Sequence, residues 1–141
     1  MALRFFLALS LLALTVRGVP LHPRTASGLV IVTLDTARAD RLSTYGFMDA
    51  AFPAIERLAR EGIIFDRASS VVPLTLPAHC SIFTGLLPPE HGVRDNGDSA
   101  LAESQTTLAE ILRAEGFRTG AFVAAQVLAS DRGLAQGFGV Y

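Results

Sequence analysis

Lysine is absent from the sequence, because all 12 basic residues among its 141 are arginine. The chain therefore offers no lysine for a Schiff base, a covalent nucleophile or a phosphate-binding loop. Its single cysteine, Cys80, excludes an internal disulfide and a cysteine-rich metal site. With 13 acidic residues the net charge is −1, so the basic excess of a nucleic-acid-binding protein is missing and we expect no nucleic-acid partner.

The composition is that of a folded protein. Half of the residues are hydrophobic and 18% are charged, and 141 residues are enough to bury a real core. This balance argues against a disordered tail, a fibrous repeat and a disulfide-stapled small domain.

The N-terminus has the features of a secretion signal. After a short basic start, Phe5–Val16 run for twelve residues without a charge, whereas a membrane-spanning helix needs about 20. Val16 and Gly18 supply small residues before a cleavage point. We therefore expect a signal peptide over residues 1–18, a linker over 19–27, and export to the periplasm or the exterior. The alternatives are a buried helix or an uncleaved anchor, and only the anchor implies a membrane.

Strand and helix signals alternate along the remainder. We expect strands at residues 29–34, 63–65 and 118–124, and helices from Pro53 to Gly62, over 77–83, and from a capping box at Thr107 and Glu110 to near Gly116. Pro88 and Pro89 predict a loop. This order predicts an α/β fold with a mainly parallel sheet flanked by helices.

Asp35 ends the first apolar run. In open α/β sheets ligands bind beyond the carboxyl ends of the strands, so a carboxylate at this position suits a hard divalent cation. An aspartate that caps a helix or shapes a turn is the alternative from the residue alone.

Thr75 precedes Pro77, which predicts a helix start. Free backbone N–H groups and the helix dipole favour negative charge there. The Thr75 hydroxyl is therefore a candidate nucleophile, activated by a metal or a base, beside the simpler interpretation that it caps the helix.

Four segments in order resemble the sulfatase family of the alkaline phosphatase superfamily. Residues 28–46 (GLVIVTLDTARADRLSTYG) resemble its opening strand and loop, and residues 53–65 (PAIERLAREGIIF) resemble its first helix and next strand. Residues 75–92, with SIFTGL and HG, resemble its nucleophile segment, and GFRT at 116–119 matches the element after the following helix. The resemblance covers residues 28–141 and implies the N-terminal, incomplete part of an alkaline phosphatase-like domain.

The resemblance also implies roles for matched residues. Asp35 falls at the metal-binding aspartate of the first strand, and Thr75 falls at the cysteine that sulfatases convert to formylglycine. Threonine followed by His79 is similar to the T-x-P-N-H element of nucleotide pyrophosphatase-type phosphodiesterases, in which a metal-bound threonine attacks phosphorus. The resemblance thus makes Thr75 and His79 the catalytic residues, and Asp35 and Thr75 ligands of a divalent Ca, Zn, Mn or Mg ion.

The segment also departs from the sulfatase pattern. His79 replaces the arginine that holds formylglycine, Thr36 replaces a second acidic ligand, and Ala78 stands at the asparagine of the phosphodiesterase element. The positions of the family's sulfate-contacting lysine and histidine hold Ala124 and Gln126. Threonine-based phosphoryl transfer therefore fits these residues better than sulfate-ester chemistry.

Other polar residues nearby have simpler explanations. We interpret Cys80 as a buried structural thiol and His91 as structural. Arg94, Asp95 and Asn96 either line the mouth of the site or form a solvated turn, and Arg38 and Asp40 either form a pair or face the solvent. For His22 we expect a solvated position.

We therefore predict part of an exported, metal-dependent hydrolase of sulfate or phosphate esters, acting on a small molecule or on a glycan or lipid ester. Two ligands do not complete a metal site, so we expect this chain alone to be inactive. The alternatives are a phosphodiesterase or phosphoethanolamine-type transferase that uses Thr75, and a non-catalytic truncated remnant.

Overall fold

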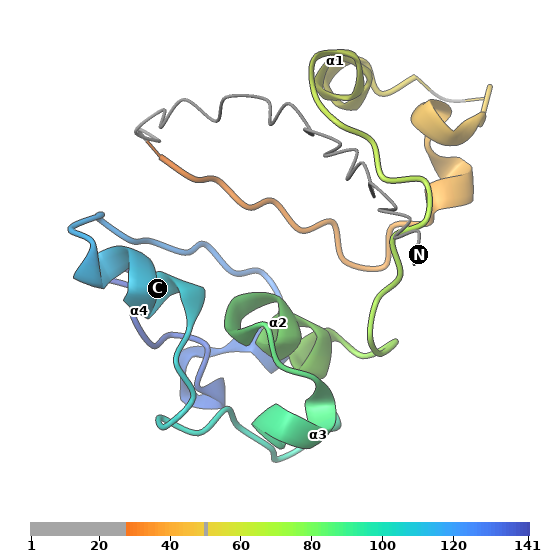
Figure 1. Ribbon diagram of the computed structural model, residues 1–141. Helices are drawn as coiled ribbons and strands as arrows, with labels where there is room; N and C mark the ends of the chain where they lie inside the picture. Colours follow the sequence, from red (N-terminus) through yellow and green to blue (C-terminus); the bar gives the residue numbers. More distant parts are fainter. Residues whose placement is uncertain (1–27, 50) are drawn as a thin grey trace, which may run out of the picture. The chain divides into compact units, whose positions relative to one another are not determined.

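A computed structural model describes residues 28–49 and 51–141 (Figure 1). The chain divides into two units between Val30 and Ile31, and every element named here belongs to the second. The α-helices are α1 (Pro53–Glu61), α2 (Thr75–Thr84), α3 (Pro88–His91) and α4 (Leu108–Ala114). Four 3-10 turns accompany them: η1 (Ala39–Arg41), η2 (Ser43–Tyr45), η3 (Gln126–Leu128) and η4 (Ser130–Arg132).

All three expected helices are present. α1 begins at Pro53, whose missing N–H costs nothing in a first turn, and ends before Gly62. α4 begins after Thr107, where the capping box forms as predicted. α2 ends at Gly85, which has a left-handed φ of 72°. It begins at Thr75, two residues before Pro77, so the proline lies inside the first turn.

The loop expected at Pro88 and Pro89 is wrong, because these residues open the short helix α3. Prolines are tolerated in a first turn, where backbone N–H groups lack partners in any case. The Glu90 side chain accepts a hydrogen bond of 2.7 Å from the Leu87 N–H and so ties the start of this turn.

The expected strands are not formed in the described part of the chain. Only an isolated parallel bridge joins Gly120 to Val140, supported by a 2.9 Å hydrogen bond from the Ala121 N–H to the Val140 carbonyl. Residues 29–34 and 63–65 have no ladder partner, and their apolar side chains are exposed, with Val30 at 85%. A strand exists only through hydrogen bonds to a neighbouring strand, so local sequence alone does not form one. The predicted parallel sheet is therefore not confirmed.

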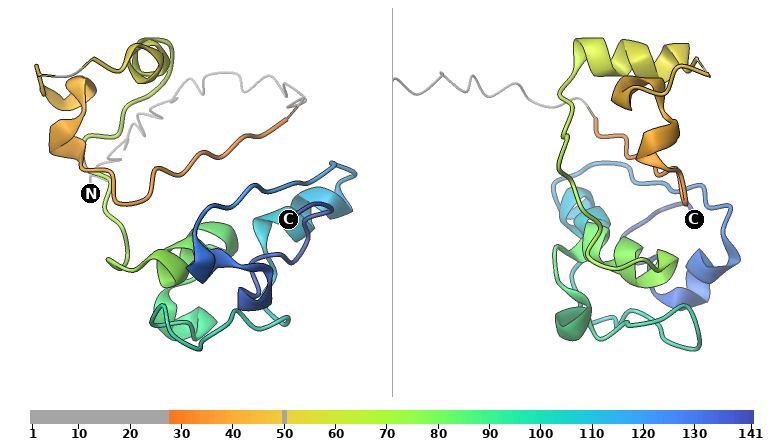
Figure 2. Two further views of the ribbon diagram at one scale, coloured as in Figure 1. Left: turned by 180° about the vertical axis from the view of Figure 1, so that it is seen from behind. Right: turned by 90° about the vertical axis from the view of Figure 1, so that its right-hand side faces the viewer.

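The core lies around α2, which contacts α3, α4 and η3 (Figures 1 and 2). Its buried apolar side chains are Leu76, Cys80, Val93, Leu101, Leu128 and Leu134, and Phe83, Ala125 and Val127 pack against them. Leu76 and Cys80 lie one helical turn apart and face this cluster together. The first turn of α2 is therefore anchored by the core.

In the ranges that the structure describes, no helix is long and apolar enough to cross a membrane. The predicted signal peptide and linker, and His22, lie outside the described residues.

Candidate active site

The two principal candidates from the sequence, Asp35 and Thr75, are in contact. The Thr75 hydroxyl donates a hydrogen bond of 3.0 Å to Asp35 Oδ2 across 40 residues of sequence. Thr75 is the first residue of α2, and its hydroxyl makes no capping bond, because the N-cap position belongs to Leu74. The capping interpretation of Thr75 is therefore wrong.

A tight turn presents the Asp35 carboxylate. The Ala37 N–H donates to the Leu34 carbonyl at 3.2 Å, which closes a four-residue turn with Asp35 and Thr36 at its centre. Thr36 has a φ of 56°, in the left-handed region that β-branched residues rarely adopt. This strained residue directly follows the carboxylate, a placement often found at functional sites.

The Asn96 side chain caps the first turn of α2. Its Oδ1 accepts a hydrogen bond of 2.9 Å from the Leu76 N–H, one of the free donors of the first turn. The sequence alone allows two interpretations of Asn96, as a residue at the mouth of the site or as part of a solvated turn. A capping partner 20 residues away leaves no local signal, so only the folded chain brings Asn96 to the Leu76 N–H.

The His79 ring contacts the Thr75 backbone and the Thr33 side chain rather than the Thr75 hydroxyl. Its Nδ1 lies 2.8 Å from the Thr75 carbonyl oxygen, and its Nε2 lies 3.3 Å from Thr33 Oγ1. A carbonyl only accepts, so Nδ1 is the protonated nitrogen and Nε2 accepts from the Thr33 hydroxyl. The ring is buried, at 8% exposure.

Arg38 and Asp40 pair with each other just after the turn. Arg38 donates two hydrogen bonds, at 2.9 and 2.6 Å, to the two carboxylate oxygens of Asp40. These bonds lower the pKa of Asp40 and raise that of Arg38. Both side chains are exposed, so solvent screens the pair.

Cys80 and His91 lie in the core. Burial raises the pKa of the Cys80 thiol to about 11, so this side chain is an inert hydrophobe, as the sequence predicted. His91 is 3% exposed, and its Nε2 lies 3.0 Å from Ser81 Oγ. The structural interpretation of both residues is confirmed.

Asp35 and Thr75 together supply two hard oxygen donors, which is the chemistry that Ca²⁺, Mg²⁺ or Mn²⁺ prefers. Asp35 Oδ2 and Thr75 Oγ1, 3.0 Å apart, are the oxygen atoms that would hold such a cation. Over residues 28–49 and 51–141, no group of three or more His, Cys, Asp or Glu side chains is placed to hold a metal. Asp35 and Thr75 therefore fit two neighbouring ligand positions of a metal site, and the described residues do not provide the remaining ligands.

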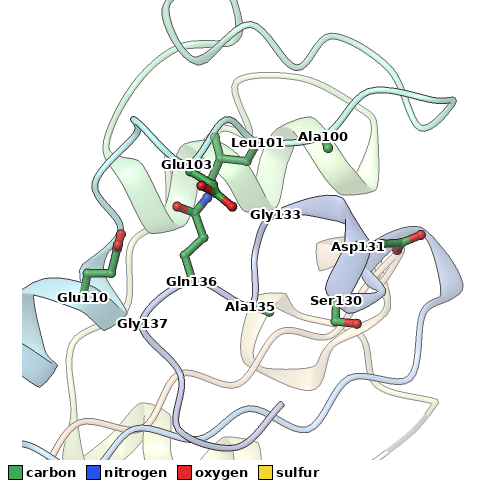
Figure 3. Close-up of a pocket in the computed structure, with 10 residues that line it drawn as sticks. All are labelled: Ala100, Leu101, Glu103, Glu110, Ser130, Asp131, Gly133, Ala135, Gln136 and Gly137. Atoms are coloured by element: carbon green, nitrogen blue, oxygen red, sulfur yellow. The ribbon is translucent and has the colours of Figure 1, made fainter.

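A separate cavity of about 630 Å³ lies between the start of α4 and the C-terminal segment (Figure 3). Its charged lining residues are Glu103, Glu110 and Asp131. None of the residues that surround Thr75 lines it. Glu110 is already engaged there by the Thr107 N–H at 2.8 Å.

Comparison with known proteins identifies the family. The sulfatase family matches residues 27–139, which is most of the chain. Steryl-sulfatase of Mus musculus is 30% identical over 107 residues, covering 69% of this chain and 17% of the relative. A bis(5'-adenosyl)-triphosphatase of Pongo abelii is 35% identical over 69 residues, covering 48% of this chain and 14% of the relative.

The fold agrees with this assignment. A solved structure of a Bacteroides thetaiotaomicron protein classed as a sulfatase superimposes with a TM-score of 0.63 at 24% identity, covering 72% of this chain and 22% of that one. The chain belongs to the sulfatase family, and its fold is that of the corresponding part of these proteins. It spans less than a fifth of the length of the curated relatives it matches.

Proposed function

We propose that this chain supplies the nucleophile segment of an exported, metal-dependent ester hydrolase, with Thr75 as the nucleophile and Asp35 as a metal ligand. The observation that carries this proposal is the 3.0 Å hydrogen bond between Thr75 Oγ1 and Asp35 Oδ2 at the start of α2. The substrate class is a sulfate or phosphate ester of a small molecule, a glycan or a lipid. The proposed domain spans residues 28–141, after a signal peptide over 1–18 and a linker over 19–27.

The position of Thr75 favours attack on an anionic centre. Thr75 lies at the positive end of the helix dipole of α2, which stabilises negative charge on a bound ester. Asn96 holds the Leu76 N–H and so fixes the orientation of the same turn. The Thr75 side chain is therefore fixed before substrate binds, and less orientational entropy is lost in the reaction.

Asp35 and Thr75 would hold a divalent cation of the kind that sulfatase-family enzymes use. Such a cation lowers the pKa of a coordinated hydroxyl and withdraws charge from the ester oxygens. The Asp35 carboxylate already accepts the hydrogen bond from Thr75, so it lies in position to receive the hydroxyl proton.

The proposed reaction has two steps. Thr75 Oγ1 forms a bond to the sulfur or phosphorus atom while the bond from that atom to the ester oxygen breaks. The Thr75 proton passes to Asp35, and the leaving alcohol takes a proton from solvent. Water then forms a bond to the sulfur or phosphorus atom while the bond to Thr75 Oγ1 breaks. Oγ1 takes back the proton held by Asp35, the proton lost by the water passes to solvent, and sulfate or phosphate leaves.

Phosphate-ester chemistry is the second candidate, in the form of a phosphodiesterase or a phosphoethanolamine-type transferase. Two observations favour it: threonine occupies the nucleophile position, and a bis(5'-adenosyl)-triphosphatase is 35% identical to this chain over 69 residues. In the transferase, an acceptor hydroxyl would take the place of water in the second step.

The test uses the polypeptide encoded by the complete reading frame that carries this sequence. Aryl sulfate, phosphate monoester and phosphodiester substrates are compared with added Ca²⁺, Mg²⁺, Mn²⁺ or Zn²⁺. Thr75→Ala should lower kcat at least about 1,000-fold and Thr75→Ser much less, since the serine hydroxyl restores the nucleophile.

The control is Thr106→Ala, because Thr106 is exposed on the loop before α4. Equal activity of Thr75→Ala and Thr106→Ala would overturn the nucleophile assignment. A reading frame that ends without further metal-ligand segments, together with no turnover, would favour the non-catalytic remnant.

A further inference from the structure

Two polar contacts join the segment that ends at Asp35 to helix α2. The first is the bond from the Thr75 hydroxyl to Asp35 Oδ2, at 3.0 Å. The second is the contact between Thr33 Oγ1 and His79 Nε2, at 3.3 Å. Each pairs one residue of the segment with one residue of the helix.

The distance between the two contacting residues is similar on the segment and on the helix. Thr33 and Asp35 are two residues apart, a separation of about 6.6 Å in an extended chain. Thr75 and His79 are four residues apart, which is about 6.0 Å along a helix and places both on one face. Both contacts can therefore form together, and the Thr33 contact helps to place Asp35 opposite Thr75.

His79 is fixed at both ring nitrogens. Its Nδ1–H donates to the Thr75 carbonyl at 2.8 Å, and its Nε2 accepts from Thr33. The ring is largely buried and is bonded to the backbone of the residue that carries the nucleophilic hydroxyl. A rotation of the ring away from this position would release Thr33 and the Thr75 carbonyl together.

The segment has little else to hold it to α2. Thr33 and its neighbours are exposed, and the main-chain groups of residues 31–33 form no ladder in the described part of the chain. Side-chain contacts to the helix therefore determine where this segment lies.

We propose that His79 is a positioning residue: in its Nδ1-protonated form it links Thr33 to the Thr75 backbone and so holds Asp35 opposite the Thr75 hydroxyl. It acts through these two partners and does not touch the reacting atoms. Its importance for turnover rests on the proposed function of Thr75, whereas the hydrogen-bonded linkage itself does not.

The first test is spectroscopic and needs no activity. The complete chain, labelled with ¹⁵N-histidine, is studied by long-range ¹H–¹⁵N NMR at about pH 7.5, where an ordinary histidine is neutral. We expect the Nδ1-protonated tautomer for His79. Thr33→Val should shift the His79 Nε2 resonance, whereas Thr106→Val should leave it in place. An Nε2-protonated ring, or a resonance insensitive to Thr33→Val, would overturn the linkage.

The second test measures kinetics in the polypeptide of the complete reading frame. Thr33→Val should lower kcat by about 10- to 100-fold with little change in KM, because a displacement of about 1 Å costs such factors. Thr33→Ser, which keeps the hydroxyl, should restore most of the rate. His79→Asn keeps a donor near the Nδ1 position and should lose less than His79→Ala.

The two proposals fail separately. If Thr75→Ala is fully active, the nucleophile assignment falls, while the NMR result still decides the linkage. If Thr75→Ala is inactive and Thr33→Val matches Thr106→Val in kcat, the positioning role falls and the proposed function stands. Thr33→Val replaces an exposed side chain by one of the same shape, so circular dichroism should show an unchanged fold, and this variant decides the question if the His79 variants do not fold.

Discussion

A hydrogen bond of 3.0 Å between His91 Nε2 and Ser81 Oγ ties α3 to the middle of α2. The other ring nitrogen, Nδ1, accepts from the Val93 N–H at 3.2 Å. His91 is therefore neutral with its proton on Nε2, the opposite tautomer to that of His79. Protonation of Nδ1 would place two donors against each other inside the core.

Stability should depend on pH through His91. Burial lowers the pKa of His91 below its ordinary 6.5, although backbone hydrogen bonds and Glu90 oppose this shift. Between the folded pKa and about 6.5 the unfolded chain binds more protons, so stability rises with pH across this window and is lost as pH falls through it. Urea unfolding at several pH values should show this slope, and His91→Gln should reduce it. An unchanged slope in His91→Gln would contradict the prediction.

Cys80 should be unreactive in the folded chain. With its pKa raised to about 11 and its side chain in the core, almost no accessible thiolate exists near pH 8. Ellman's reagent should label the thiol promptly only in guanidinium chloride. Labelling at equal rates with and without denaturant would show that the α2 core is open.

Gly137→Ala should be among the most destabilising single substitutions. Gly137 has a φ of 81°, and an added Cβ would clash with the backbone nitrogen of Glu110. Gly85 has a similar φ of 72° with open space around it, so Gly85→Ala is the matched control. We expect Gly137→Ala to cost about 2–3 kcal/mol more than the control in urea unfolding, because backbone atoms must move. Equal losses of stability in the two variants would mean that the positive φ, and not the clash with Glu110, causes the loss.

Thr107→Ala should destabilise α4. The fully buried hydroxyl accepts from the Glu110 N–H at 3.2 Å, and the Glu110 carboxylate accepts in return from the Thr107 N–H at 2.8 Å. Loss of this cap should lower the free energy of unfolding by about 1–2 kcal/mol. Thr107→Ser should recover most of it, and Thr106→Ala should cost little. A loss with Thr106→Ala as large as with Thr107→Ala would rule out the capping explanation.

Thr36→Asn should stabilise the turn that presents Asp35. A β-branched residue at a φ of 56° is strained, whereas asparagine adopts this conformation readily. The expected gain is about 1 kcal/mol in the free energy of unfolding, measured in urea. Thr36→Val, which keeps the branched shape, is the control and should give no gain. A loss with Thr36→Asn would indicate that the threonine side chain stabilises the turn by another contact.

The sequence by itself determined α1, α4 and the end of α2, since Pro53, Gly62, Gly85 and the Thr107–Glu110 capping box act within a few residues. It missed α3 and the first two residues of α2. It also singled out Asp35 and Thr75, because a carboxylate after an apolar run and a hydroxyl at a helix start are local patterns.

Only the tertiary structure decided the contacts between distant segments. Asp35 meets Thr75 across 40 residues, Asn96 meets Leu76 across 20, and His79 turns to Thr33 rather than to the Thr75 hydroxyl. No local rule predicts such pairs, because they depend on how the chain packs around α2. The expected strands are not formed in the described residues for the same reason: apolar β-branched residues favour an extended chain, but strand formation requires a partner that local sequence does not provide.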